Sequence, residues 1–470
     1  MINEMVLHQG KKTPKGFYSL EAMARRYLNY EFDPPEQTVL WDHLALKKNI
    51  RTTFSLTEPF TKAQVFYGAA DVILPFKISR IQDELVRKHG FETATKLENK
   101  FTPVLAEIEL AGMPFNVEDW CDNTDLYTAK FEAAKVILDN WVEQNYPEFE
   151  GINWNSHKQV TRLFKTIGIP TQIVDKDKSS DEETVYKDTV GEVHIAKYSK
   201  KFPIIKEYLD YKHLSKLVSS YGLKFLRFVN PVTGRVHSDF RQILNTNRIS
   251  SSGPNLQNIP GEGNRPGFRK CFNVGPDRAL VAADYSSQES RVLADRSKEP
   301  SMLDFFLNGD GDMHSFTARR MFKVPVSSKE NLDKRRIGKF LNFSIAYGAS
   351  PHKVADSLSI PIKQAKEFID LFYAAYPKLK TYFLEQQLLA LSRGYVEIDS
   401  VTKRVSFQDP MYFEYSKYMA SCKKFGVKPS SKVVSKYRAL KGEIERNAQN
   451  YPIQGTSGNM TKLAAVLFRA

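Results

Sequence analysis

The chain has 470 residues, of which 41% are hydrophobic, enough to form the cores of about three domains. It carries 68 Lys and Arg residues against 54 Asp and Glu residues, a net charge of +14, which favours a polyanionic partner. Three widely separated cysteines indicate neither a disulfide framework nor a cysteine metal site. No apolar run reaches membrane-spanning length and the N-terminus lacks a signal-peptide pattern, so we expect a cytoplasmic protein with no membrane partner.

The N-terminal part of the chain contains a helix start and a polar pair. Ser19 is the predicted N-cap of a helix that runs through Tyr27. Tyr67 and Asp71 stand four residues apart, so on a helix the phenol and the carboxylate share one face and could meet one phosphate. Two unrelated surface residues on an ordinary helix are the usual explanation for such a pair.

Segment 96–230 is predicted to be mostly helical, because it contains few Gly or Pro residues. The highly charged residues 174–192 are predicted to form an exposed loop. In segment 208–217 apolar and basic residues alternate at helical spacing, which places Lys212 and Lys216 on one face. These two lysines either contact phosphates or are solvated side chains, and the sequence favours neither interpretation.

A short buried strand is predicted over the four apolar residues 280–283, and it ends at Asp284. A carboxylate at that place is costly to bury unless it is paired or holds a metal, although many strand ends carry an ordinary acid. A Pro/Gly turn is predicted over 230–237, and residues 301–400 are predicted to be largely helical.

A mixed stripe of cations and aromatics follows. Arg335, Lys339, Phe343 and Tyr347 recur at four-residue intervals, which places them along one helix face. Arg and Lys hold phosphates, and aromatic rings offer a flat apolar surface to a base or sugar. The alternative is an amphipathic helix with its aromatics inward and its cations outward. We expect Asp284 to lie opposite this stripe.

Stretch 417–441 contains eight basic residues and no acidic one, with Tyr418, Phe425 and Tyr437 between them. Such a stretch could follow a nucleic-acid strand through charge and stacking. An exposed basic loop with no specific role is the favoured interpretation.

Four segments resemble motifs of family A DNA polymerases and stand in that family's order. They are TNRISSSGPNLQNIP at 246–260, DYSSQESR at 284–291, RRIGKFLNFSIAYG at 335–348 and ERNAQNYPIQGT at 445–456. The resemblance implies an α/β (α+β) right-hand polymerase with a helical thumb, a palm sheet and helical fingers. The implied units are the C-terminal part of a 3′–5′ exonuclease-like domain (1–95), a linker and thumb (96–230), the first part of the palm (231–300), the fingers (301–403) and an incomplete second part of the palm (404–470).

The resemblance also implies template-directed addition of deoxynucleotides to a primer 3′ end, with primer-template DNA and dNTP as partners. The reaction would use Mg²⁺, held by Asp284 and the backbone carbonyl of Tyr285. Arg335 and Lys339 would act with Asp284 in catalysis by clamping the triphosphate, and Glu289 matches the side chain that excludes a ribose 2′-hydroxyl. The implied nucleotide-binding residues are Ser287, Gln288, Glu289, His314, Arg335, Lys339, Phe343 and Tyr347. The implied DNA-binding residues are Lys212, Lys216, Arg248, Asn255, Gln257, Arg446, Asn450 and Gln454.

Departures from the family pattern lead to further expectations. Four residues of these motifs differ from the family's usual ones: Ser287, Gln288, Ser290 and Ser344. Similar variation occurs among phage-type members, which suggests a phage-type origin. Tyr67 and Asp71 match an exonuclease motif, but no Asp-x-Glu precedes them, so we expect no proofreading. The family's second palm carboxylate, in a His-Asp-Glu motif, is also absent. This favours a fragment of a longer polymerase over a split gene whose second polypeptide completes the site.

Two other functions stay open. A single-subunit RNA polymerase shares the palm and a similar fingers helix, although Glu289 and the PNLQNIP segment speak against it. A non-catalytic DNA-binding fragment of a split polymerase fits the missing carboxylate. By itself the chain is expected to bind primer-template DNA but to extend it poorly or not at all.

Overall fold

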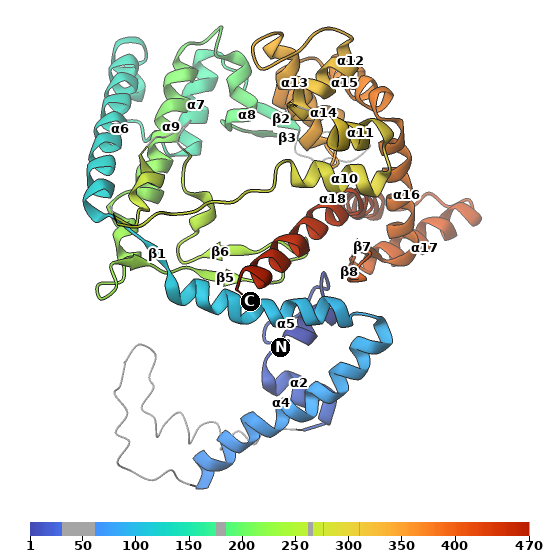
Figure 1. Cartoon of the computed structure of the whole chain (residues 1–470). Helices are drawn as coiled ribbons and strands as arrows, with labels where there is room; N and C mark the ends of the chain where they lie inside the picture. The colour runs from blue at the N-terminus through green and yellow to red at the C-terminus, as the bar shows by residue number, and fades with distance from the viewer. Residues whose placement is uncertain (31–61, 175–184, 262–266, 276, 310, 470) are drawn as a thin grey trace.

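The computed structural model describes residues 1–30, 62–174, 185–261, 267–275, 277–309 and 311–469. Within these ranges the chain is mostly helical, and its eight short strands pair into four two-stranded antiparallel sheets. Two helical lobes stand side by side above a base that contains α5, α18 and the β5–β6 pair (Figure 1). Among the helices of these ranges, none has the length and apolarity that a membrane span requires.

The N-terminal part consists of helices in the residues that the structure describes. Ser19 caps α2 as predicted, because its hydroxyl accepts the Ala22 N–H at 3.2 Å. Met23 and Ala24 of α2 pack against Leu74 of the long helix α4. The helices of this part are α1 (Ile2–Leu7), α2 (Leu20–Leu28), α4 (Lys62–His89) and α5 (Glu92–Ala111).

The first lobe, which we call the α6–α9 lobe, is built on α6 (Val117–Asn145) packed against α9 (Ile204–Tyr221). The helix predicted over 208–217 is therefore confirmed as part of α9. The loop predicted over 174–192 is only partly correct, since Tyr186–Asp188 forms a strand, while residues 175–184 lie outside the described ranges. The smaller elements are η1 (Pro147–Phe149), α7 (His157–Ile167), β2 (Gln172–Val174), β3 (Tyr186–Asp188), α8 (Glu192–Ile195), η2 (Ala196–Tyr198) and η3 (Leu223–Phe228).

Short sheets form the base between the lobes. Asn230 accepts the N–H groups of Val232 and Thr233 through its side chain, and Gly234 has a φ of +64°, so the predicted turn is confirmed. The base elements are β1 (Met113–Pro114) paired with β4 (Arg235–Val236), β5 (Asp239–Arg241) paired with β6 (Ser250–Ser252), η4 (Leu256–Asn258) and η5 (Phe268–Cys271).

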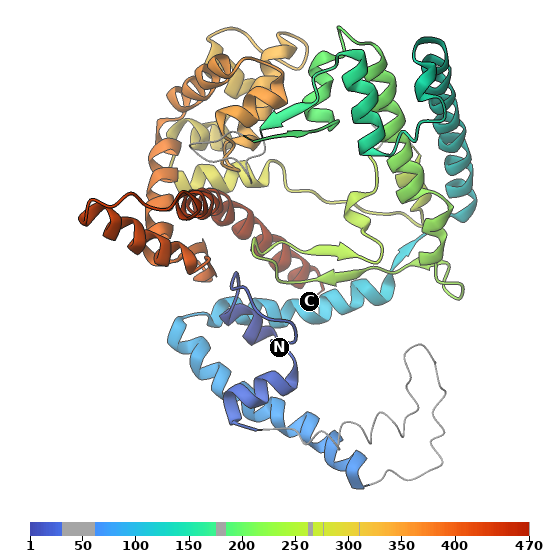
Figure 2. The ribbon, with the colours of Figure 1, turned by 180° about the vertical axis from the view of Figure 1, so that it is seen from behind.

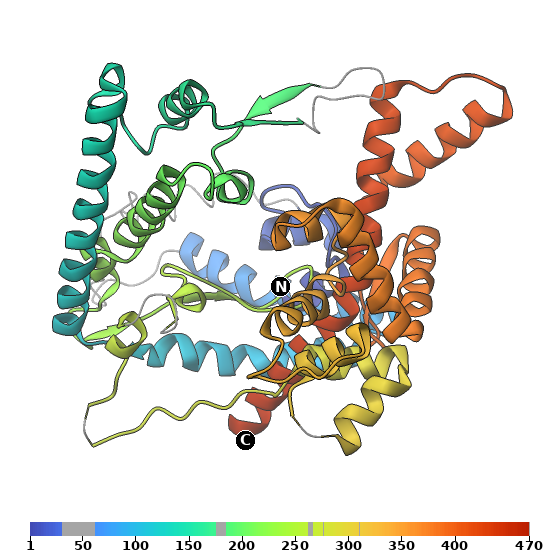
Figure 3. The same cartoon turned by 90° about the horizontal axis from the view of Figure 1, so that it is seen from above.

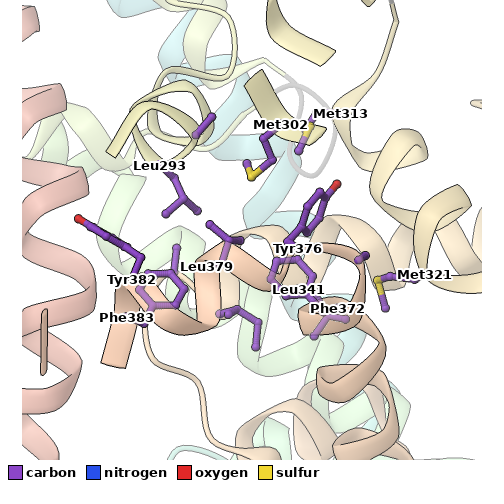
Figure 4. Packing of buried hydrophobic residues seen from close by; sticks show 14 of the residues in the cluster. Leu293, Met302, Met313, Met321, Leu341, Phe372, Tyr376, Leu379, Tyr382 and Phe383 are labelled. Carbon is purple, nitrogen blue, oxygen red and sulfur yellow. The ribbon is translucent and has the colours of Figure 1, made fainter. Parts of the chain in front are cut away.

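The second lobe, the α10–α16 lobe, is helical as predicted for residues 301–400. Its core is formed by apolar side chains from successive helices, among them Leu341, Phe372, Tyr376 and Leu379 (Figure 4). Its elements are α10 (Gln288–Ser297), α11 (Pro300–Asn308), α12 (Met313–Phe322), α13 (Leu332–Ser344), α14 (Pro351–Leu358), α15 (Ile362–Ala375) and α16 (Pro377–Arg393).

The strand predicted over 280–283 is wrong. The segment is extended but unpaired, and Leu280 and Val281 are 51% and 93% exposed. Figure 1 shows it crossing from the base beneath the α6–α9 lobe to α10. Backbone groups of a strand need partners from a neighbouring strand, and no described strand lies beside this segment to supply them.

The C-terminal part contains β7 (Tyr395–Asp399) paired with β8 (Arg404–Phe407), α17 (Met411–Lys424) and the 39-residue α18 (Ser431–Arg469). The basic loop predicted over 417–441 is also wrong. Most of this stretch belongs to α17 and α18, because apolar residues such as Tyr412 and Ile444 give both helices a buried side.

A buried ionic cluster ties the N-terminal helices to the C-terminal part. The Glu98 carboxylate on α5 lies 2.6 Å from Arg404 Nη1 on β8 and 2.6 Å from Lys462 Nζ on α18, and all three side chains have 0% exposure. Burial by itself raises the pKa of Glu98, but the two cations lower it overall. Burial also lowers the pKa of Lys462 to about 8. The cluster fixes three elements that are far apart in the sequence.

Replacing Glu98 with Gln should lower the free energy of unfolding by about 3–5 kcal/mol, because two buried cations lose their counter-charge. Chemical denaturation of the chain measures this loss. Glu92→Gln, an exposed position on the same helix, is the matched control and should leave the midpoint nearly unchanged. A loss as small as that of the control would contradict the role of the cluster.

Candidate nucleotide-binding site

A cavity of about 770 Å³ lies beside the C-terminal half of α13. Cations and aromatics dominate its wall, and Arg446 of α18 closes one side. The lining residues are Arg336, Lys339, Phe340, Phe343, Ser344, Tyr347, Gly348, Ala349, Ser350, Lys353 and Arg446. This composition suits a ligand that combines phosphate groups with a planar ring.

Helix α13 packs tightly on α12, and Gly338 makes this approach possible. A Cβ atom at Gly338 would stand 2.8 Å from the carbonyl oxygen of His314, so a larger residue would push the helices apart. The buried side of α13 includes Leu341 and Asn342, and Asn342 bonds to Thr317 of α12. The opposite side is left for the cavity.

The predicted stripe is largely confirmed in its geometry. Arg335, Lys339 and Phe343 lie on α13 and share a face, whereas Tyr347 lies in the turn that follows the helix. Phe343 is 45% exposed, so this ring does not point into the core as the amphipathic alternative requires.

Arg335 is paired with Asp312 at the start of α12. The Nε–Oδ2 distance is 2.7 Å, and the same carboxylate caps α12 by accepting the N–H groups of His314 and Ser315. Burial alone would raise the pKa of Asp312, but hydrogen bonds from Ser315 and Arg335 lower it to about 2. The sequence points to His314 but not to this ion pair, because the pair joins two helices that are separate in the sequence.

His314 lies between this ion pair and the stripe. Its Nδ1 is 3.2 Å from Asn342 Nδ2, and its ring centroid is 5.4 Å from that of Phe343. Burial lowers the pKa of His314; Asp312 raises it, while Arg335 and Lys339 lower it further. The overall shift favours the neutral imidazole.

One hydrogen-bonded group joins three of the four sequence motifs. Tyr347 Oη donates to Glu289 Oε2 at 2.6 Å, and Arg248 donates to Tyr347 Oη at 3.4 Å. Arg248 also forms an ion pair with Glu289. Burial, reinforced by the bond to Glu289, raises the pKa of Tyr347. These bonds hold Glu289 of α10 against Tyr347, which follows the end of α13 and lines the cavity.

The residues before Glu289 have different surroundings. Asp284 is exposed, and within the described ranges its carboxylate has no hydrogen bond or ion pair; Tyr285 is 50% exposed. Ser287 has a φ of +53° at the start of α10. Gln288 Nε2 donates to the Ser457 carbonyl of α18 at 3.3 Å, so it joins two helices rather than lining the cavity.

The described residues contain no group of three or more His, Cys, Asp or Glu side chains that could enclose a metal ion. The Asp284 carboxylate is a free, hard oxygen ligand of the kind that Mg²⁺ prefers. It fits one anchoring ligand, but a centre that holds two ions needs further acids.

The predicted DNA-binding residues fall into two groups. On α18, Arg446, Asn450 and Gln454 follow one another at four-residue intervals, and Arg446 is exposed while Gln454 is 7% exposed. The remaining residues lie on the base and on α9. Asn255 accepts the Gln257 N–H, Gln257 donates to the Ile249 carbonyl, Lys212 donates to Asn155, and Lys216 is exposed on α9.

The predicted exonuclease pair lies far along the chain from this site, on α4. Asp71 is exposed, whereas the side chain of Tyr67 lies outside what the structure describes. The exonuclease assignment stays a prediction.

Comparison with known proteins identifies the class. Residues 127–470 match the family model of DNA polymerase family A. The whole-chain fold resembles the POL domain of Pol1 from M. smegmatis in complex with DNA primer-template and dNTP, with a TM-score of 0.72, 24% identity, and coverage of 99% of this chain and 70% of that one. The right-hand polymerase fold predicted from the sequence is confirmed.

The chain belongs to DNA polymerase family A. It is 31% identical over 378 residues to the thermostable DNA polymerase I of Thermus aquaticus, covering 79% of this chain and 40% of that protein. It is 32% identical over 457 residues to DNA polymerase I of Pseudomonas aeruginosa, covering 96% and 45%. The chain thus spans less than half the length of these curated relatives. Members of this family are generally metal-dependent.

The electrostatics around His314 can be tested with two substitutions of opposite effect. Lys339→Met should raise the pKa of His314, because a nearby cation is lost, and Asp312→Asn should lower it, because an anion is lost. A pH titration of the histidine ring signals by NMR, with the signal assigned from a His314→Gln variant, measures both shifts. Shifts of the same sign, or none, would contradict the placement of these charges.

Proposed function

We propose that this chain is the polymerase part of a template-directed DNA polymerase that adds deoxynucleotides to a primer 3′ end. The observation that carries the proposal is the cavity at α13, where a cation–aromatic face meets the Glu289–Tyr347 pair. Membership of family A adds independent support, as does the likeness to a polymerase domain that was solved with primer-template and dNTP.

The triphosphate would bind along α13. Lys339 is exposed on the cavity wall and is joined there by Arg336 and Lys353, so three cations surround one space. Arg335 stands one turn further toward the start of α13, where it is held by Asp312. His314 of α12 lies beside Asn342 and Phe343. Lys339 is the residue placed to donate to the departing pyrophosphate, and its charge favours the transition state in which negative charge grows there.

Glu289 would select the sugar. Its carboxylate is held by Tyr347 and Arg248, so it cannot swing away to make room for a 2′-hydroxyl. Phe343 and Tyr347 supply the apolar surface for the base and sugar. This arrangement favours a deoxynucleotide over a ribonucleotide and argues against the RNA polymerase alternative.

Mg²⁺ is the proposed metal, with the Asp284 carboxylate and the Tyr285 carbonyl as its ligands. When bound, the ion would neutralise triphosphate charge and activate the primer 3′-hydroxyl. The described residues contain no group of three or more His, Cys, Asp or Glu side chains that could hold a metal ion, and we propose that further polypeptide, linked or separate, supplies a second carboxylate.

Primer-template DNA would lie between the lobes. In this proposal the α6–α9 lobe, with Lys212 and Lys216, acts as the thumb, and the α10–α16 lobe as the fingers. Arg446, Asn450 and Gln454 of α18, together with Asn255 and Gln257, would donate to acceptors that every correct base pair presents in the minor groove.

The proposal predicts a ternary complex whose nucleotide affinity depends on Lys339. On a primer with a blocked 3′ end, the chain should bind the complementary dNTP more tightly than the other three. Lys339→Ala should weaken that binding about tenfold or more, because a charge-assisted contact to phosphate is lost. Lys366→Ala, an exposed lysine on α15, is the matched control and should not change it. Equal affinity for all four nucleotides, or no effect of Lys339→Ala, would contradict the proposal.

A further inference from the structure

Residues 411–441, which we call the arm, project from the body of the molecule. The arm consists of α17, a short turn and the beginning of α18, and it lies at the opposite end of the molecule from α6 (Figures 1 and 2). Figure 3 shows its two helices at an angle to each other, with their outer ends joined by a non-helical segment. The chain thus builds a separate projection next to the cavity-bearing lobe.

The arm is an ordered structure rather than a loose loop. The rings of Tyr412 and Tyr437 stack with centroids 5.6 Å apart and planes 13° apart, which joins α17 to α18. At the tip, the Val427 N–H donates to the Cys422 carbonyl at 2.9 Å, and the Ser430 N–H donates to Tyr418 Oη at 3.2 Å. These bonds fix the turn that presents the tip.

The surface of the arm is basic and partly aromatic. Its acid-free part, 417–441, has eight basic residues, and the nearest acids are Glu414, which pairs with Lys417, and Glu443 and Glu445. Phe425 at the tip is 73% exposed. The exposed basic residues are Lys417, Lys423, Lys424, Lys428, Lys432, Lys436 and Arg438. A surface with this excess of positive charge attracts a polyanionic partner.

Lys432 and Lys436 are in phase with the proposed DNA face of α18. At about 100° per residue, both fall within a sector of about 80° that also contains Arg446, Asn450 and Gln454. The distance along the helix from Lys432 to Gln454 is about 33 Å, since a helix rises about 1.5 Å per residue. The exposed residues Ala439 and Glu443 also fall in this sector, so the arm lysines and the proposed DNA face lie along one side of one helix with a single acid between them.

The order of the residues along α18 indicates on which side of the cavity the arm lies. Arg446 lines the cavity with Tyr347 and Gly348, so it marks the place where the next nucleotide would enter. The beginning of α18, which contains Lys432 and Lys436, lies on the side away from the α6–α9 lobe (Figure 1). If the duplex lies between the lobes, the template that has not yet been copied leaves the cavity on the side of the arm.

We infer that the arm binds single-stranded template DNA ahead of the insertion site. Lys432 and Lys436 contact its phosphates, and Phe425 stacks on a base; both contacts tolerate any sequence. The inference rests on the proposed function and extends it to a surface outside the cavity. Lysines in phase with the proposed DNA face fit a nucleic-acid strand better than an acidic protein.

The test measures the affinity of the chain for primer-templates whose 5′ template overhang grows from about 2 to about 16 nucleotides. The wild-type chain should bind the long overhang about tenfold more tightly than the short one. Lys432→Ala/Lys436→Ala and Phe425→Ala should each lose most of this gain. Two lost phosphate contacts should also reduce the salt slope of long-overhang binding by about 1.4.

The matched control is Lys96→Ala/Lys100→Ala, which removes two exposed lysines four residues apart on α5 and should keep the full gain. Three results would overturn the inference: no gain from the overhang, a gain that the arm variants retain, or a gain that persists when a complementary strand fills the overhang. Failure of the proposed function would differ, because the chain would then not bind even the short-overhang primer-template.

Discussion

The contact among Arg248, Glu289 and Tyr347 is the interaction on which the site depends. It joins the base, the start of α10 and the end of α13, segments that are up to 99 residues apart in the sequence. The carboxylate accepts from two donors on two different elements, and these bonds hold it in position. The wall of the cavity is therefore rigid where a sugar would meet it. In the proposed function the cations of α13 would hold the phosphates of the nucleotide, and the Arg248–Glu289–Tyr347 group would limit the space for its sugar.

Helix α18 connects this site to the remaining structure. Lys462 anchors it in the buried cluster with Glu98 and Arg404, Ser457 receives the bond from Gln288, and Arg446 closes the cavity. The same helix then continues outward into the arm. A helix that is fixed at its buried end holds its exposed side chains at set distances from one another. In the proposed function this one helix would therefore align its contacts to the duplex, the insertion site and the template over about 33 Å.

Local features of this fold could be predicted from the sequence, whereas features that depend on distant segments could not. The cap at Ser19, the helix around Tyr208 and the stripe on α13 follow from spacing and propensity within one element, and the motifs identified the family. The strand over 280–283 was predicted from apolar residues alone, but a strand also needs a neighbour. The basic stretch predicts a loop because it is rich in charge, whereas the buried residues Tyr412 and Ile444, which anchor its two helices, lie outside it. The ion pair of Arg335 with Asp312 joins two helices, so the spacing within either helix could not reveal it.

In the proposed function Glu289, fixed by Tyr347 and Arg248, sets the sugar preference of the cavity. The most direct measurement is the ratio of dNTP to rNTP affinity on a blocked primer-template, for the wild-type chain, Glu289→Ala and the control Glu367→Ala, an exposed acid on α15. The wild-type chain and the control should bind the dNTP about tenfold or more tightly, and Glu289→Ala should lose most of this preference while still binding dNTP. An unchanged ratio in Glu289→Ala, or a wild-type preference for rNTP, would contradict the account.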